Sequence, residues 1–139
     1  MPFEWPWREI EMSARLLLAA VFGAGVGYER EQSDKPAGLR RHILVALGAA
    51  LFSVVALYGI GGVGDPARVA AQIVAGIGFL GAGAIRHLPN TVKGLTTAAS
   101  IWVTSAIGMA VGVVMYAISA VTTVIVLAVL RLIRTRKDA

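Results

Sequence analysis

A charge-free stretch rich in glycine is the feature of this chain that most constrains its fold. Residues 69–85 carry no charged side chain, and positions 76, 78, 81 and 83 are all glycine. In water each glycine would cost a helix about 1 kcal/mol relative to alanine, and the stretch has no polar face to turn toward solvent. In a bilayer the same glycines let helix backbones approach closely, and unpaired peptide groups are too costly there for the helix to unravel. The stretch therefore predicts a membrane helix.

The same stretch contains Gly76-x-Gly78-x-x-Gly81, a spacing that also occurs in dinucleotide-binding loops. That fingerprint requires a preceding strand and an acidic residue about 20 positions later, which binds the ribose. After Asp65 the sequence has no Asp or Glu before Asp138. We therefore interpret these glycines as helix-packing residues, and we expect no cofactor.

The composition indicates a single membrane domain. Hydrophobic residues make up 57% of the 139 positions and charged residues 15%, and the mean hydropathy is +0.73. Ordinary soluble domains are less apolar and more charged. The sequence has no cysteine, which excludes disulfides, thiolate metal sites and thiol nucleophiles. The net charge of +5 does not indicate nucleic-acid binding, because the basic residues lie between apolar segments and not in one stripe with aromatic residues.

Four charge-free runs define the membrane segments, at residues 16–28, 42–64, 69–85 and 94–130. A bilayer core of about 30 Å needs about 20 helical residues. The last run is therefore long enough for two helices, with a break predicted near residues 112–115. The sequence predicts an all-α, polytopic bundle of five transmembrane helices in one domain, at about residues 10–29, 42–62, 66–86, 94–112 and 115–133. The alternative is four helices, with the last run as one long tilted helix.

Proline positions and the distribution of charge support five helices. All five prolines lie outside the charge-free runs, and Asp65-Pro66 has the pattern of a helix cap followed by a first-turn proline. With five helices, ten lysines and arginines fall on one side of the membrane and three on the other, whereas four helices give six and seven. Because basic residues favour the cytoplasmic side, we expect the N-terminus outside and the C-terminus inside. The first residues are too polar for a cleavable signal peptide, so we expect them to be retained.

Five motifs follow one another along the membrane region. They are Glu29-Arg-Glu31, Ala37-Gly-Leu-Arg40, Asp65-Pro-x-Arg68, Ala70-Ala-Gln-Ile-Val-x-Gly-Ile-Gly-Phe-Leu-Gly-Ala-Gly83 and Lys93-Gly-Leu-Thr-Thr-Ala-Ala-Ser-Ile-Trp102. Together they resemble the MgtC/SapB family of bacterial inner-membrane proteins, over roughly residues 12–115.

The resemblance implies a multi-pass inner-membrane protein linked to magnesium homeostasis and, in pathogens, to survival inside host cells. For the MgtC branch it further implies a regulatory role that includes inhibition of the F-type ATP synthase. Members of that branch carry a soluble carboxyl-terminal domain, whereas this sequence stops soon after Arg136-Lys137. We therefore expect the short SapB-like form.

Polar residues in or beside the spans are the candidate functional residues. Glu29 and Arg30 lie at the inner end of the first helix, where an ionisable side chain at membrane depth indicates function. The alternative is a pair of interfacial side chains that extend toward water. Asp65 fits a helix cap better than a ligand, and Gln72 fits a hydrogen bond to a neighbouring helix. The full set is Glu29, Arg30, Arg40, Asp65, Arg68, Gln72, Thr96, Thr97 and Ser100.

Two further groups of residues carry expectations about contacts. The hydroxyls of Thr96 and Ser100 lie one turn apart and usually bond back to their own helix, although the resemblance favours a shared site. Arg15 lies too far along the first helix to reach Glu29, so we expect each to meet lipid headgroups or another helix. Glycines at helical spacing predict a compact bundle and a homodimer, although the same repeats serve contacts within one chain; they are Gly23, Gly27, Gly76, Gly78, Gly81, Gly83, Gly108 and Gly112.

An enzyme is difficult to build from these residues. His42 and His87 stand beside basic residues at loop edges, with no nucleophile and acid arranged nearby, so we expect both to be interfacial. A magnesium site needs several oxygen ligands, and only Glu29, Glu31 and Asp34 lie close together, in a loop shared with four cations. Magnesium ligands therefore stay undetermined.

Two classes of function remain. In the first, the bundle is a regulatory module that binds another membrane protein through its small-residue faces, with its basic loops near membrane lipids. In the second, it is a transporter or channel for magnesium or another small ion. The sequence has few ionisable groups within its spans and no proline-broken helix, which favours the regulatory module.

Overall fold

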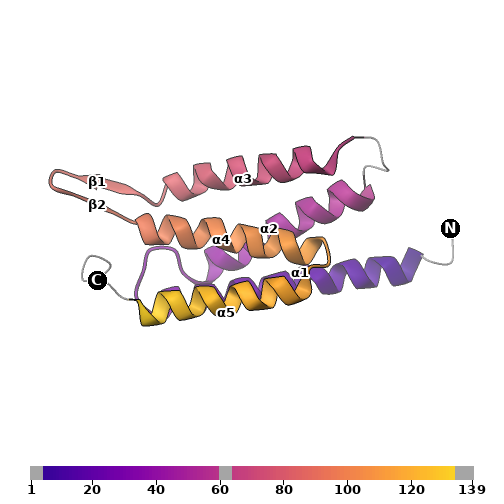
Figure 1. Ribbon diagram of the computed structural model, residues 1–139, viewed down its shortest axis with the longest axis horizontal. Coiled ribbons are helices and arrows are strands. Elements are labelled where there is room, and N and C mark those ends of the chain that lie inside the picture. The colour runs from indigo at the N-terminus through magenta and orange to yellow at the C-terminus, as the bar shows by residue number, and fades with distance from the viewer. Residues whose placement is uncertain (1–4, 60–63, 134–139) are drawn as a thin grey trace.

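Five α-helices run alternately in opposite directions in the part of the chain that the structure describes (Figure 1). This computed structural model describes residues 5–59 and 64–133. The helices are α1 (Trp5–Gln32), α2 (Leu39–Val54), α3 (Pro66–Ala82), α4 (Leu95–Gly112) and α5 (Tyr116–Leu132), and α2 continues as a short π-helix, η1 (Val55–Gly59). The prediction of an all-α bundle of five helices is therefore confirmed.

Length and surface character identify a membrane protein. Within the described ranges, three helical segments are long and apolar enough to cross a bilayer: Pro6–Gln32, Leu39–Gly59 and Leu95–Gly112. The apolar helices α3 and α5 have 17 residues each, which is close to the lower limit for a span. Large apolar side chains cover the outside of the bundle, among them Leu17 at 71% and Phe79 at 82% exposure. A surface of this kind is suited to hydrocarbon and not to water.

Helix α2 lies between α1 and α4, and its backbone touches both. A Cβ atom added at Gly23 of α1 would lie 2.6 Å from the carbonyl oxygen of His42, and one added at Gly108 of α4 would overlap the carbonyl group of Ala46. Gly27 meets Leu39 and Gly112 meets Ala50 in the same way. These four glycines therefore lie at the crossings of α2 with its two neighbours, where only a missing side chain permits such close approach.

The core between these helices consists of small side chains. Ala19, Ala46, Ala50 and Val111 are fully buried, and Phe22 packs against them. Small residues let the helix axes approach, so that backbone and Cβ atoms supply most of the contact.

Helix α3 packs mainly against α4. Gly81 faces Ala98 of α4, with 3.5 Å between an added Cβ and the Ala98 carbonyl oxygen. A Cβ added at Gly76 or Gly78 would meet nothing within 4 Å, and one at Gly83 would meet only carbonyl oxygens of its own turn. Of the four glycines in this segment, Gly81 alone contacts a second helix within the described residues.

Two local predictions are confirmed at helix ends. The Oδ1 atom of Asp65 accepts a hydrogen bond from the Ala67 amide at 2.9 Å, and Pro66 is the first residue of α3. Helix α4 ends at Gly112 and α5 begins at Tyr116, so the last apolar run does contain two helices.

A β-hairpin between α3 and α4 was not predicted. Strands β1 (Arg86–Leu88) and β2 (Thr91–Lys93) pair antiparallel, with Arg86 opposite Lys93 and a two-residue turn. The hairpin extends beyond the helices (Figure 1). Three-residue strands are too short to show the alternation of apolar and polar residues that marks a strand in a sequence.

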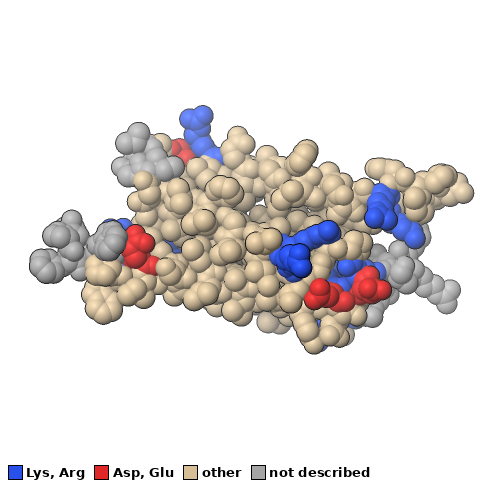
Figure 2. Space-filling model, turned by 180° about the vertical axis from the view of Figure 1, so that it is seen from behind, with Lys and Arg blue, Asp and Glu red and all other residues tan. Residues whose placement is uncertain are grey.

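Basic residues concentrate at the end of the bundle that carries the hairpin, the α1–α2 connection and the end of α5; we call this the hairpin end, and the opposite one the far end (Figures 1 and 2). Of the basic residues that the structure describes, seven lie in the segments at the hairpin end: Arg30, Lys35, Arg40, Arg41, Arg86, Lys93 and Arg131. Arg8, Arg15 and Arg68 lie toward the far end. The predicted Arg134, Arg136 and Lys137 lie outside the described residues.

Candidate functional site

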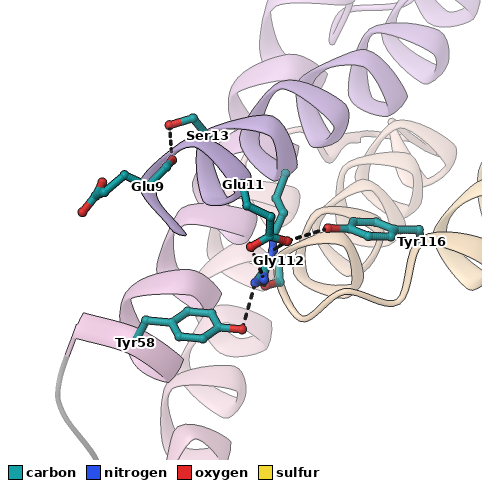
Figure 3. A network of polar contacts seen from close by, with 7 residues as sticks. Glu9, Glu11, Ser13, Tyr58, Gly112 and Tyr116 are labelled. Carbon is teal, nitrogen blue, oxygen red and sulfur yellow. Dashed lines mark hydrogen bonds and ion pairs between the residues drawn. The ribbon is translucent and has the colours of Figure 1, made fainter. Parts of the chain in front are cut away.

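The first of two polar clusters lies toward the far end of the bundle and includes Glu11, Tyr58, Gly112 and Tyr116 (Figure 3), with Arg15 as the common partner of the first three. Only 5% of Arg15 is exposed, and its guanidinium forms a two-pronged ion pair with Glu11, with Nε–Oε1 and Nη2–Oε2 distances of 2.7 and 2.6 Å. The remaining nitrogen, Nη1, donates to the Gly112 carbonyl at 3.0 Å and to the Tyr58 hydroxyl at 3.2 Å. Tyr116 donates to Glu11 at 3.2 Å. We call Glu11, Arg15, Tyr58, Gly112 and Tyr116 the Arg15 cluster.

The Arg15 cluster joins four elements. Glu11 and Arg15 come from α1, Tyr58 from η1, Gly112 from the last turn of α4, and Tyr116 from the first turn of α5. The Gly112 carbonyl is one of the groups that a helix end leaves without a partner in its own helix, so the arginine supplies a bond that the helix cannot. Arg15 therefore meets other helices, as expected, and also a glutamate one turn earlier on its own helix.

The second cluster lies at the hairpin end, and His42 is at its centre. The His42 side chain is completely buried, with Nδ1 2.9 Å from the Gly38 carbonyl and Nε2 2.9 Å from the Ser100 hydroxyl of α4. The Ser100 hydroxyl also donates to the carbonyl of Thr97 at 2.8 Å. The expectation that His42 is an interfacial residue is therefore wrong. His42 lies inside α2, on the face that contacts α1 and α4.

Arg30 extends this second cluster to α1. Its Nη2 donates to the Thr97 hydroxyl at 3.0 Å, and both side chains are buried, with 3% and 2% exposure. Glu29, the neighbour of Arg30, is 2% exposed and accepts a hydrogen bond from Ser33 at 2.9 Å. The interfacial alternative for Glu29 and Arg30 thus does not describe their environment. We call Arg30, Gly38, His42, Thr97 and Ser100 the His42 cluster, with Glu29 and Ser33 beside it.

The structure therefore brings together four of the nine candidate residues, namely Glu29, Arg30, Thr97 and Ser100. Thr96 is half-buried one position before Thr97. The other four lie elsewhere: Arg40 is exposed in the first turn of α2, Asp65 caps α3, and Arg68 and Gln72 are exposed on α3.

His42 is the residue that the sequence interpretation missed, together with its partner Gly38. Two arginines precede His42, and they suggested a loop edge. A signal was nevertheless present, because small residues follow His42 at intervals of three or four, at Ala46, Ala49, Ala50 and Ser53. That period places the histidine on the face of the helix that packs most tightly.

A largely apolar groove runs between α2 and α3, with α4 at its floor. Its volume is about 760 Å³, and its walls include Gly48, Phe52, Ile73, Gly76 and Leu80. Arg68 and Gln72 also line it, at the end where α3 begins. The Gln72 side chain is exposed, and Gly78 is not among the residues that line this groove.

The acidic residues around the end of α1 that could supply oxygen ligands to magnesium do not form one exposed site. Glu29 is buried and bound to Ser33, whereas Glu31 and Asp34 are exposed. Among the residues that the structure describes, no three acidic, histidine or cysteine side chains have a metal-binding arrangement.

The model of the MgtC family matches residues 16–138. A putative magnesium transporter, YhiD, of Escherichia coli (strain K12) is 46% identical over 127 residues, which cover 86% of this chain and 59% of that protein. Protein MgtC of Brucella abortus is 43% identical over 129 residues, which cover 92% of this chain and 54% of that protein. The chain thus spans between half and three fifths of the length of these relatives. No solved structure matches it.

Proposed function

Because this chain belongs to the MgtC family, we propose that it is a non-enzymatic regulatory protein of the bacterial inner membrane, linked to magnesium homeostasis, that acts by binding another membrane protein. The F-type ATP synthase is the complex we propose as its target. The resemblance of the sequence to the MgtC branch suggests that target.

The groove between α2 and α3 is the observation that carries this proposal. A helix surface that faces only lipid has no need of a 760 Å³ hollow whose wall contains glycine, whereas a helix that docks does, because small residues let it approach closely. The carboxamide of Gln72 lies about 9 Å along α3 from its first residue, at 1.5 Å per residue. At that depth an exposed amide gains most from a hydrogen bond to a second helix.

The two buried arginines also favour a regulatory function over a path for magnesium through the bundle. Arg15 and Arg30 lie 15 positions apart on α1, or about 22 Å along the helix, near its two ends. A guanidinium repels a divalent cation, although less strongly where a carboxylate is paired with it, as Glu11 is with Arg15. A magnesium ion crossing between the helices would pass both guanidinium groups.

Magnesium transport is the second candidate, because the Escherichia coli relative is named a putative magnesium transporter. The two functions differ in what the protein does alone. A transporter moves magnesium in liposomes that contain only this chain, whereas a regulator moves none and alters a second protein.

The experiment reconstitutes ATP synthase into liposomes with and without this chain and measures ATP-driven proton pumping. We expect the wild-type chain to inhibit pumping and Gly76→Leu to inhibit it much less, because leucine at position 76 projects into the groove. Gly78→Leu is the matched control, since that glycine has equal free space but does not line the groove. Equal inhibition by both variants, or no inhibition by the wild type, contradicts the proposal. Magnesium flux with the chain alone supports the transporter.

The positive-inside rule supports the proposed orientation, with the hairpin end in the cytoplasm. Because the chain contains no cysteine, single cysteines at exposed positions test it without background. Asn90→Cys in the hairpin turn should react with an impermeant thiol reagent only after the cells are opened. Gly64→Cys, before α3, should react in intact cells, and the reverse pattern contradicts the orientation.

A further inference from the structure

We propose that His42 is a proton-binding site inside the bundle, and that its protonation changes the hydrogen bonds which join α2, α4 and α1. The proposal depends on the geometry of the His42 cluster alone, and not on the groove or on the identity of any partner protein.

The hydrogen-bonding capacity of each group determines where the protons lie in three short contacts around His42. The Gly38 carbonyl only accepts hydrogen bonds, so Nδ1, 2.9 Å away, must carry a proton. In neutral His42 the other nitrogen, Nε2, is then an acceptor. The Ser100 hydroxyl has one proton and lies 2.9 Å from Nε2 and 2.8 Å from the Thr97 carbonyl. It can donate fully to only one of these two acceptors at a time.

A second proton on His42 removes this competition. The Nε2–H group then donates to the Ser100 oxygen, and the Ser100 proton is released to the Thr97 carbonyl. The proton that binds comes from water, and no other group in the cluster gains or loses one. The two protonation states of His42 therefore correspond to two directions of the Ser100 hydroxyl, and the protonated state satisfies every contact observed.

Thr97 connects the Ser100 hydroxyl to Arg30 of α1. Its carbonyl accepts from Ser100, while its hydroxyl accepts from Arg30 at 3.0 Å. One residue of α4 is thus bonded to both the serine–histidine pair and the arginine. Hydrogen bonds in a chain of this kind polarise one another, particularly where water is excluded.

The first turn of α2 packs closely against α1 at His42. A Cβ atom added at Gly27 of α1 would lie 3.0 Å from the Cβ of His42, and α1 also meets the His42 carbonyl through Gly23. The backbone and Cβ of His42 are therefore fixed against α1, and its buried ring is joined to Gly38 and Ser100 by its two nitrogens.

Charged side chains of α1 and of α2 lie around His42. Glu29 and Arg30 of α1 are the charged side chains whose fields act on the ring, with opposite signs. The residues that α4 contributes, Thr97 and Ser100, are uncharged. Glu31, in the last turn of α1, is exposed and lies beside Gly38. Arg40 and Arg41 on α2 itself are exposed, and Arg41 donates to the Pro36 carbonyl.

A proton has a short way to travel to this site. His42 lies in the first turn of α2, which begins at Leu39, so the distance from the hairpin end is about one helical turn, or roughly 5 Å. Histidine is also the side chain whose ordinary titration range lies nearest to physiological pH.

The test uses NMR on the full-length chain in detergent micelles, with labelled histidine and arginine. The chain has two histidines, and exposed His87 serves as an internal reference. Between pH 5 and 9 we expect the ring signals of His42 to titrate, and the side-chain signals of Arg30 to change with the same midpoint. The signals of Arg15 at the far end should not follow that midpoint, which makes Arg15 the matched control for Arg30. In Ser100→Ala the His42 midpoint should shift by about one pH unit, whereas Ser100→Thr should leave it near the wild-type value.

Three results overturn the proposal. They are a His42 ring that does not titrate while the protein stays folded, an Arg30 that is insensitive to a His42 titration, and an unchanged midpoint in Ser100→Ala. If Ser100→Ala does not fold, the comparison of Arg30 with Arg15 in the wild type decides the question by itself.

Discussion

The Arg15 cluster and the His42 cluster do the same structural work at opposite ends of the bundle by different chemistry. Each joins α1 to α4 and to the α2–η1 segment. The Arg15 cluster relies on an ion pair whose carboxylate is half-exposed, whereas the His42 cluster uses an arginine, an imidazole and hydroxyls that are all enclosed. Water reaches the half-exposed carboxylate directly, whereas the helices enclose the histidine and the serine. An ion pair therefore joins the helices at the far end, and hydrogen bonds between buried side chains join them at the hairpin end.

The largest effect should come from removing the carboxylate of the Arg15 cluster. Glu11→Ala leaves a guanidinium that is 5% exposed without its counter-charge, and we expect a loss of about 3 kcal/mol in the free energy of unfolding. Unfolding in mixed detergent and SDS micelles measures it. Glu9→Ala is the control, because Glu9 is exposed and its only contact in Figure 3 is made by its backbone carbonyl, which accepts from Ser13. Equal losses in both variants would show that the ion pair contributes little.

Replacing the central histidine should have the next largest effect. His42→Leu removes the bond between α2 and α4 and leaves the Gly38 carbonyl without its side-chain donor, so we expect about 2 kcal/mol of destabilisation. His87→Leu, an exposed position on β1, should lie within about 0.5 kcal/mol of the wild type in the same titration. If His42→Leu is as stable as the wild type, the histidine does not stabilise the hairpin end of the bundle.

The sequence predicted those features of the fold that depend on neighbouring residues. The apolar runs, the Asp65-Pro66 cap and the break after Gly112 each follow from a few consecutive residues and the solvent they face. The ion pair between Glu11 and Arg15 has the four-residue spacing of helical salt bridges, so it too was within reach of the sequence.

Features that depend on which helices meet could not be predicted in this way. The glycines at positions 76 and 108 both belong to close-spaced glycine groups, yet Gly108 touches Ala46 and Gly76 faces open space. Only the arrangement of the helices distinguishes them. The same holds for His42 and Ser100, which lie 58 positions apart and meet because α2 lies against α4.

A smaller effect is expected for the hydroxyl that crosses between helices in the His42 cluster. Ser100→Ala removes the hydrogen bond with His42 but leaves the helical bonds of α4 in place, so we expect a loss of about 1 kcal/mol. The same unfolding titration measures it at a single pH. Ser100→Thr keeps the hydroxyl and should recover most of the stability. A threonine variant no more stable than the alanine variant would mean that volume, and not the hydrogen bond, determines the effect.

The smallest effect should appear one turn further along α4, at a hydroxyl that is just as buried but bonds within its own helix. Thr104 is fully buried, and its hydroxyl donates at 2.7 Å to the Ser100 carbonyl, which is also the carbonyl that the Thr104 amide reaches in a regular helix. Thr104→Val therefore removes a bond without leaving an acceptor unpaired, and it places a methyl group where the hydroxyl was. We expect a change within about 0.5 kcal/mol of zero in the same titration. A loss as large as that of Ser100→Ala would mean that burial alone makes these hydroxyls important. A near-neutral result would show that a polar group contributes to the bundle through the helix it reaches, because only such a bond is broken when the helices separate.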